Sequence, residues 1–270
     1  MAILKPMPYM YGNLNMKDLE ELKKKEKFVL IFPIGSIESH GPHCPLDTDE
    51  LNSTEVALRA AKKLDGMGYK AYVLPAFVYT TSYAARNFPG TINISPETVT
   101  KIISEICIQL INQGMDKICI CNNHGDPWHV KAIYNASDEI YKRTGVRLIY
   151  PDKTRKKYVS TLPLSYQKGT CHGDSYEVSM VMAINPSLIN EERRKVLPHV
   201  HVNLVEKMFK ERLDDFKLMG MTESYTGDPA SATAEEGEQT LDTIADIMVE
   251  SIEDRFQGKE EEVKRGLFGR

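Results

Sequence analysis

The sequence predicts an α/β protein with a mainly parallel central sheet, and two patterns carry this prediction. Short apolar runs alternate with longer helical patterns along the whole chain of 270 residues, which is typical of strand–helix–strand units. The first run, residues 28–34 (FVLIFPI), contains no charged or polar side chain, as expected for a strand buried on both faces. The chain shows no internal repeat and no linker, so we expect one domain over residues 1–270, with a charged end at 258–270 that frays.

The elements follow in order along the chain. A charged helix near residues 17–25 precedes the first strand. The clearest helix start is at Ser95, because Ser95 can cap the helix, Pro96 fits its first position, and Gly114 stands beyond its end. Residues 151–172 are predicted to be irregular. The other expected elements are strands at 70–74, 117–121 and 146–150, and helices at 49–64, 127–143, 175–184, 203–214 and 233–256.

Composition and charge exclude several classes of protein. Hydrophobic residues make up 41% and charged residues 27% of the chain, which indicates a globular protein rather than a disordered one. No run reaches the roughly 18 uncharged apolar residues of a membrane-spanning helix, and the N-terminus has no signal-peptide core, so we expect a cytoplasmic protein without a membrane partner. The net charge of −4 offers no continuous positive field for nucleic acid. Five cysteines without a CxxC pair disfavour a disulfide framework.

Polar side chains that can bind metal ions collect just after the predicted strands, where parallel α/β sheets place their ligands. Glu38 and His40 follow the first strand two residues apart, so in extended backbone they leave the same face. Asp49 lies at the start of the next helix, and His124 follows another strand. Carboxylates and imidazoles are ligands for a catalytic Zn, Mn or Fe ion. Because the chain offers more candidates than one ion needs, two divalent ions bridged by Asp49 are the sharper hypothesis.

Each candidate also has an interpretation without a metal. Glu38 and His40 could form an ion pair at the strand end while Asp49 caps the following helix. His124 could be a hydrogen-bonded histidine in a turn. Glu177 stands three residues after Asp174, which is the spacing of a capping box, so it could simply close the start of a helix.

Five segments, in the same order along the chain, resemble the creatininase (creatinine amidohydrolase) family of metal-dependent hydrolases. They are residues 33–43 (PIGSIESHGPH) with 47–49, residues 88–92 (FPGTI), residues 123–125 (NHG), His172-Gly173 with Glu177 and Ser179, and residues 227–229 (GDP) with Ala234 and Gly237. The resemblance implies a three-layer α/β/α sandwich and a homo-oligomer, commonly a hexamer.

The same resemblance implies a centre of two divalent metal ions. Asp49 would bridge the ions, with Glu38 and His124 on one ion and His40 and Glu177 on the other. His172 would act beside Glu177 in the catalytic set, as a proton carrier. A further candidate ligand is Asp126, at a position where some relatives carry a glutamate that binds metal.

From this resemblance we expect an enzyme that hydrolyses a non-peptide amide, cyclic or formyl, of a small molecule through a metal-bridging hydroxide. Residues 151–171 contain none of the tryptophans with which creatininase closes over its substrate, so creatinine is disfavoured. One rival keeps the centre but hydrolyses a carbon–carbon or ester bond of a cyclic polyol ketone or lactone, such as an oxidised inositol. Another is a binding protein with a structural metal. A P-loop enzyme is excluded because the GxxxxGK pattern is absent from the sequence.

Overall fold

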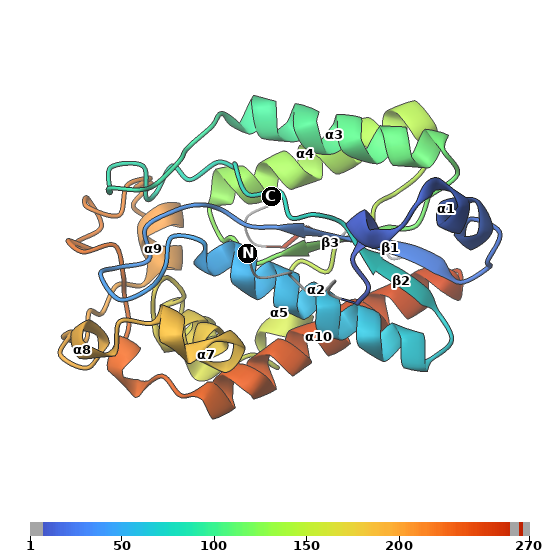
Figure 1. Ribbon diagram of the computed structural model, residues 1–270. Coiled ribbons are helices and arrows are strands. Elements are labelled where there is room, and N and C mark those ends of the chain that lie inside the picture. The colour runs from blue at the N-terminus through green and yellow to red at the C-terminus, as the bar shows by residue number, and fades with distance from the viewer. Residues whose placement is uncertain (1–7, 260–264, 267–270) are drawn as a thin grey trace, which may run out of the picture.

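A computed structural model describes residues 8–259 and 265–266 of the chain and shows a parallel sheet between two layers of helices (Figure 1). The sheet has the order β2-β1-β3, with β1 at Phe28–Ile34, β2 at Lys70–Val73 and β3 at Ile118–Asn122. The central strand β1 pairs in parallel with both neighbours, so that Leu30 lies opposite Tyr72 on one side and Ile118 on the other. The predicted parallel α/β fold is confirmed.

Each face of the sheet is covered by its own pair of long helices (Figure 1). Helices α2 (Thr48–Gly66) and α10 (Ala234–Phe256), with α7 (Ser175–Ile184), pack on one face, and α3 (Pro96–Asn112) and α4 (Pro127–Thr144) on the other. Successive side chains of a strand point to opposite faces, so Val29 joins the cluster under α2 and α10 while Leu30 joins the cluster under α3 and α4. All seven residues of β1 are buried, as its sequence predicted.

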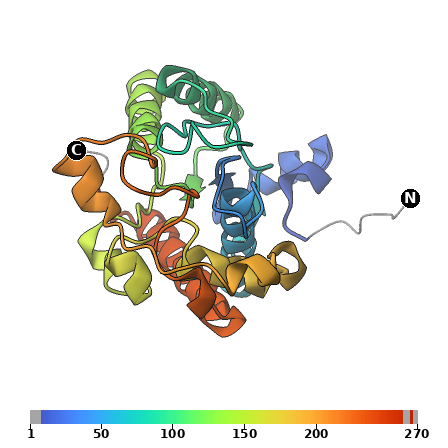
Figure 2. The ribbon, with the colours of Figure 1, turned by 90° about the vertical axis from the view of Figure 1, so that its left-hand side faces the viewer.

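The shorter elements surround this sandwich. They are α1 (Met16–Leu22), α5 (Lys156–Val159), α6 (Leu164–Gln167), α8 (Glu191–Arg194), α9 (Leu204–Phe209) and the 3₁₀ turns Tyr11–Asn13, Pro186–Leu188 and Pro229–Ser231. The strands of the sheet end toward α7, α8 and α9, and Figure 2 looks onto that edge. Among the described residues, none of the helices combines the length and apolarity required to cross a membrane.

Two expected elements differ in the structure. The strand predicted at 146–150 is reduced to a single parallel bridge between Ile149 and Cys119. Two residues earlier, the backbone carbonyl of Arg147 accepts a hydrogen bond from the Arg255 guanidinium of α10 at 2.7 Å. This carbonyl is therefore satisfied without pairing to a strand. The helix predicted at 203–214 ends at Phe209, and Arg212 beyond it has a left-handed φ of 58°, which a helix does not accommodate.

The end of the chain is described only in part. Residues 260–264 and 267–270 of the expected frayed end lie outside the described residues. Within residues 265–266, the Gly266 N–H donates to the Tyr134 hydroxyl at 3.1 Å. A single domain with a frayed end at 258–270 therefore stays a prediction.

The helices on one face approach each other closely because one of them carries a glycine at the crossing. A Cβ atom added to Gly237 of α10 would lie 1.9 Å from the carbonyl oxygen of Ser179 in α7. No side chain fits there, so Gly237 sets the distance between α7 and α10. Because Glu177 lies in the first turn of α7, this contact also fixes the position of a candidate ligand.

Candidate metal centre

Side chains from four separate segments converge beyond the carboxyl ends of β1 and β3. Among the described residues, three groups of three side chains could each hold a metal ion, because the ligand atoms within each group lie within 4.8 Å of one another. The groups are Glu38, Asp49 and His124; His40, Asp49 and Glu177; and Glu38, His40 and His172. All of these side chains are buried, so they belong to the interior of the protein rather than to a solvated acidic surface.

Asp49 lies at the junction of the first two groups. Its Oδ1 is 3.4 Å from His40 Nε2, and its Oδ2 is 3.0 Å from His124 Nδ1. Glu38 Oε1 completes the first group at 3.2 Å from His124 Nδ1, and Glu177 Oε2 completes the second at 3.5 Å from His40 Nε2. One carboxylate thus faces two imidazoles, each with a second carboxylate beside it.

Backbone carbonyls orient both imidazoles toward these carboxylates. His40 Nδ1 donates to the Glu38 carbonyl at 3.1 Å, and His124 Nε2 donates to the Thr81 carbonyl at 2.7 Å. A carbonyl can only accept, so these hydrogen bonds fix one ring nitrogen of each histidine as a donor and direct the other nitrogen into the cluster. His40 Nε2 and Asp49 Oδ2 are buried and have no hydrogen-bond partner. A cation between the groups would satisfy both atoms.

The pKa values of the cluster are shifted because acidic and basic side chains lie close together and away from water. Burial alone would lower the pKa of His40, but Glu177 and Asp49 raise it to about 10. Burial likewise opposes charging of His124, yet Glu38 and Asp49 raise its pKa well above the usual value. The pKa of Asp49 is lowered, since the two histidines outweigh its burial. In the metal-free protein, protons on the histidines therefore supply positive charge that the carboxylates require.

The end of β1 and the start of α2 are joined tightly enough to place Asp49. The Ser53 hydroxyl lies 2.7 Å from the carbonyl oxygens of both Ile34 and Asp49. A Cβ atom added to Gly35 would lie 2.6 Å from the Glu50 nitrogen, so only glycine allows the strand to approach the helix this closely. Asp49 lies within the first turn of α2 and is not its cap, since the residue at the cap position is Asp47.

Glu177 does not close a capping box with Asp174 but accepts from the residue before the cap, and its role as a metal ligand stays a prediction. Its Oε2 accepts from the Gly173 N–H at 2.7 Å, at the start of α7, and the same oxygen faces His40. The cap itself is Asp174, whose Oδ1 accepts from Tyr176 N–H at 3.0 Å. Burial raises the pKa of Glu177 to about 7, although the positive charge of His40 acts to lower it. His43, which the sequence did not select, supports this turn because its Nε2 donates to the Gly173 carbonyl at 2.9 Å.

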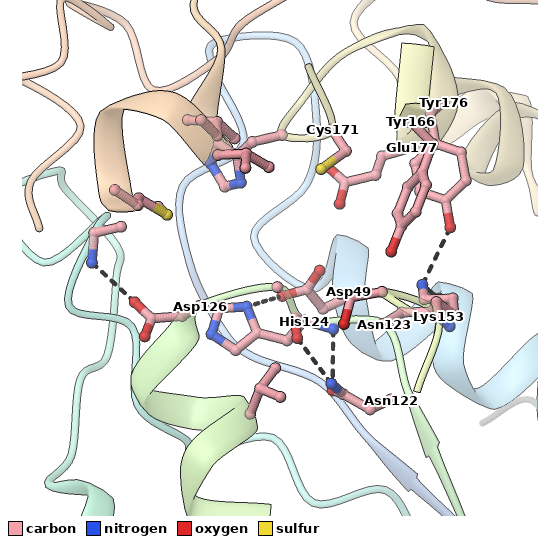
Figure 3. A pocket seen from close by; sticks show the side chains of 18 of the residues that line it. Asp49, Asn122, Asn123, His124, Asp126, Lys153, Tyr166, Cys171, Tyr176 and Glu177 are labelled. Carbon is pink, nitrogen blue, oxygen red and sulfur yellow. Dashed lines mark hydrogen bonds and ion pairs between the residues drawn. The ribbon is translucent and has the colours of Figure 1, made fainter. Parts of the chain in front are cut away.

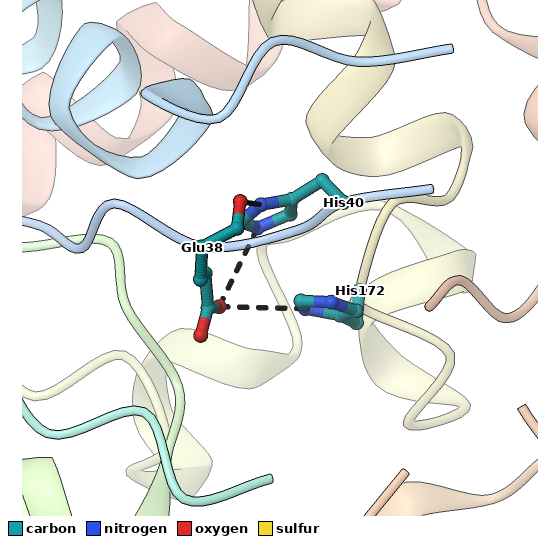
Figure 4. Close-up of side chains that lie close together, drawn as sticks. All are labelled: Glu38, His40 and His172. Carbon is teal, nitrogen blue, oxygen red and sulfur yellow. Dashed lines mark hydrogen bonds and ion pairs between the residues drawn. The ribbon is translucent and has the colours of Figure 1, made fainter. Parts of the chain in front are cut away.

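His172 lies beside the cluster with one nitrogen turned toward it. Its Nε2 donates to the Ser39 carbonyl at 2.9 Å, while its Nδ1 lies 3.7 Å from Glu38 Oε1 (Figure 4). The ring is 4.3 Å from that of His40. Burial, reinforced by the charge of His40, lowers the pKa of His172 to about 3, so the metal-free protein carries it as a neutral imidazole at pH 7. Its position suits either a proton carrier or a third imidazole ligand.

Asp126 forms the cap of α4. Its Oδ1 accepts from the Trp128 N–H at 2.9 Å, and its Oδ2 accepts from the Ala84 N–H at 3.0 Å. It belongs to none of the three groups found among the described residues. Both oxygens are engaged with the backbone, so the geometry favours a structural role, and a role as metal ligand stays an untested prediction.

A pocket opens onto the cluster and brings in residues that sequence reasoning missed. Its volume is about 70 Å³, and it is lined by Asp49, His124 and Glu177 together with Lys153, Tyr166 and Tyr176 (Figure 3). Lys153 lies in the segment that was predicted only to be irregular. No motif or spacing in the sequence marks Lys153 as a pocket residue, because only the fold brings residues 151–172 across the ends of the strands.

The fold and the site together define a class: an α/β/α hydrolase with a buried cluster of carboxylates and imidazoles at the carboxyl edge of its sheet. The chain belongs to the creatininase family, since the family's sequence model, described as creatinine amidohydrolase, matches residues 12–252. The resemblance seen in the sequence is confirmed.

Curated relatives match most of the chain. Creatinine amidohydrolase of Pseudomonas putida is 26% identical over 200 residues, which cover 67% of this chain and 74% of the relative. Mycofactocin precursor peptide peptidase of Mycobacterium tuberculosis (strain CDC 1551 / Oshkosh) is 26% identical over 239 residues, covering 83% and 84%. 3-Dehydro-scyllo-inosose hydrolase of Thermotoga maritima is 20% identical over 270 residues, covering 93% and 84%.

Solved creatininase structures share the fold. A mutant creatininase of Zn-Zn type superposes with a TM-score of 0.72 at 21% identity, covering 93% of this chain and 99% of that one. A mutant creatininase complexed with creatine gives a TM-score of 0.71 at 22% identity, covering 92% and 98%. The three-layer α/β/α sandwich is therefore confirmed.

Proposed function

We propose that this protein is a metal-dependent amidohydrolase that cleaves a non-peptide amide, cyclic or formyl, of a small molecule. The observation that carries the proposal is the position of Asp49 between His40 and His124, with Glu38 and Glu177 completing a group on either side. The family match supports the reaction class, because the family's model is described as a creatinine amidohydrolase.

The residues present fit two divalent ions. Buried His40 Nε2 and Asp49 Oδ2 lack hydrogen-bond partners, and each imidazole is oriented by a backbone carbonyl, as metal-binding histidines usually are. Glu38 and His124 would hold one ion and His40 and Glu177 the other, with Asp49 shared. The mixed oxygen and nitrogen donors suit Zn, Mn or Fe. Such ions, when bound, lower the pKa of a coordinated water to about 7 and polarise a substrate carbonyl.

His172 is the residue placed to move a proton. Its Nε2 is engaged with Ser39, so the lone pair of its Nδ1 faces the cluster and can accept a proton from the attacking water. That proton then leaves from the same Nδ1 to the amide nitrogen as the carbon–nitrogen bond breaks. In the metal-free protein burial and the charge of His40 lower the pKa of His172 to about 3, so it starts as a neutral imidazole, and metal binding, which removes the proton of His40, removes one of the two causes that make it a weak base.

A second candidate reaction uses the same centre on a cyclic polyol ketone or lactone. The observation in its favour is the match to 3-dehydro-scyllo-inosose hydrolase over 93% of this chain. The two reactions differ in their products, since only the amidohydrolase releases an amine, ammonia or formate.

A substrate panel tests the proposal. Protein reconstituted with Zn, Mn or Fe is incubated with formamides, lactams and oxidised inositols, and the release of amine, ammonia or formate is measured. We expect release from one or more of the amides, and expect Asp49→Asn to abolish it and to lower the metal content, because that variant removes the shared charge. Full activity in chelator, or wild-type turnover by Asp49→Asn, would exclude the metal-dependent mechanism.

Assembly and location stay predictions. We propose a homo-oligomer, a hexamer by family resemblance, and sedimentation velocity measures it directly. The cytoplasmic location is tested by fractionating the cells that produce the protein.

A further inference from the structure

Lys153 brings a half-buried positive charge into the pocket beside the candidate metal centre. It lines the pocket together with Asn123, Tyr166 and Tyr176. Its Nζ donates to the Tyr176 hydroxyl at 3.1 Å and to Asn123 Oδ1, and it lies 5.8 Å from the centre of the Tyr166 ring. In the view of Figure 3, Lys153 and the two tyrosines occupy one side of the pocket and Asp126 the other, with Asp49 and His124 between them.

This ammonium has only neutral hydrogen-bond partners. Within the described part of the chain, no carboxylate lies within 4.0 Å of Lys153 Nζ, whereas nearby Asp152 is engaged with Tyr134 and with Thr154. Burial lowers the pKa of Lys153, and the more distant charges of Glu177 and Asp49 oppose that effect. A half-buried cation without an ion-pair partner has lost part of its hydration, so its position in a pocket favours an anionic partner that arrives from outside.

Asn123 places a second free donor next to this cation. An ammonium can only donate, so the amide oxygen of Asn123 must face Lys153, and the amide nitrogen is directed elsewhere. That nitrogen, Nδ2, is buried and has no hydrogen-bond partner. Asn123 is 7% exposed, so solvent does not satisfy it. One charged donor and one neutral donor thus belong to two contacting residues that both line the pocket, and such a pair suits an anionic group with two oxygens.

We propose that Lys153 and Asn123 bind an anionic group of the substrate, a carboxylate or a phosphate, so that the enzyme selects small amides carrying a negative charge. This inference rests on the proposed amidohydrolase function, because it assigns the pocket to the substrate of that reaction. The volume of about 70 Å³ corresponds to only a few water molecules, so the anion and the scissile amide must lie within a short distance of each other.

Matched probes separate the charge from the rest of the ligand. Succinamate and succinamide differ only in a carboxylate against a neutral amide, and glycolamide phosphate presents a phosphate instead. Their dissociation constants are measured by calorimetry on the zinc-loaded wild type and on Lys153→Met, Lys153→Arg and the control Lys168→Met, whose lysine is exposed. Zinc content and thermal unfolding are compared first, so that only folded proteins with equal zinc are compared.

We expect the wild type to bind one of the anions roughly 10- to 100-fold more tightly than succinamide. Lys153→Met should lose this preference without weaker binding of succinamide, Lys153→Arg should retain most of it, and Lys168→Met should match the wild type. The anion that binds more tightly identifies carboxylate or phosphate as the group recognised.

Three results would overturn the inference: equal binding of charged and neutral probes by the wild type, no binding of either anion, or an undiminished preference in Lys153→Met, which would assign anion binding to the zinc ions. The wild-type comparison keeps the test decisive even where Lys153→Met does not fold. Binding requires no turnover, so the outcome is separate from the proposed reaction. Hydrolysis of neutral amides without anion preference would leave the proposed function standing and remove only this inference.

Discussion

Metal binding should release protons, and the pKa values of the side chains in the cluster determine how many. A histidine binds a metal ion only through a deprotonated nitrogen. In the metal-free protein the pKa of His40 is raised to about 10 and that of His124 well above its usual value, so both are protonated at pH 7. The pKa of Glu177 is raised to about 7, so it carries about half a proton at that pH. Loading two ions at pH 7 should therefore release about 2.5 protons from these side chains and about half a proton more from a coordinated water whose pKa falls to about 7, which makes about three in total.

The pH dependence follows with a definite sign. Glu177 contributes almost a full proton at pH 6 and almost none at pH 8, whereas the coordinated water contributes almost none at pH 6 and almost a full proton at pH 8, so the total release should stay near three protons across this range. The combined affinity for the two ions should rise by about 1000-fold per pH unit near pH 8, and the rise should become less steep as the pH passes the His40 pKa of about 10. Two histidines with ordinary pKa values would release only about half a proton in total at pH 7.

Titration calorimetry measures the number directly. The chelator-treated protein is titrated with zinc in buffers that differ in ionisation enthalpy, and the slope of the observed enthalpy against that quantity gives the protons released. A release near 1.5 protons at pH 7, the sum expected for ordinary histidines with Glu177 and the coordinated water, or an affinity that does not rise with pH, would refute the assignment of His40 and His124 as protonated partners of Asp49.

Two further variants test other parts of the account. His172→Ala should lower turnover by about 10²- to 10⁴-fold with zinc content preserved, whereas loss of zinc would make His172 a ligand, and His199→Ala at an exposed position should leave both unchanged. Gly237→Ala should lower the free energy of unfolding by about 1–3 kcal/mol in chemical denaturation, because its Cβ would lie 1.9 Å from a backbone oxygen. Gly66→Ala, where the added Cβ meets nothing within 4 Å, is its control, and equal effects of the two would contradict the packing argument.

The sequence predicted the structure correctly where a residue pattern is compatible with only one kind of element. The uniformly apolar run at 28–34 could only be a doubly buried strand, and Ser95 accepts from the Thr98 N–H at 3.2 Å as the expected cap of α3. Polar residues placed after strands were expected to meet because parallel strands end at one edge, and Glu38, Asp49 and His124 do meet there. The strand expected at 146–150 is reduced to one bridge at Ile149, and a distant residue, Arg255 of α10, binds the Arg147 carbonyl, which no local pattern indicates.

The remaining features depend on contacts that no local pattern encodes. Glu177 could be a cap or a ligand on spacing alone, and only the fold shows that the oxygen bound to Gly173 N–H also faces His40. Lys153 gives no signal in the sequence, since an irregular segment carries it into the pocket. Asp126 was a candidate ligand by family resemblance alone, and only the fold shows that its oxygens accept from backbone N–H groups of two segments.

The most direct test of the central claim is a crystal structure of the zinc-loaded protein with anomalous scattering measured at the zinc edge. The account predicts two zinc peaks, with Asp49 bound to both, Glu38 and His124 on one, and His40 and Glu177 on the other. A single peak, or zinc bound away from Asp49, would contradict it.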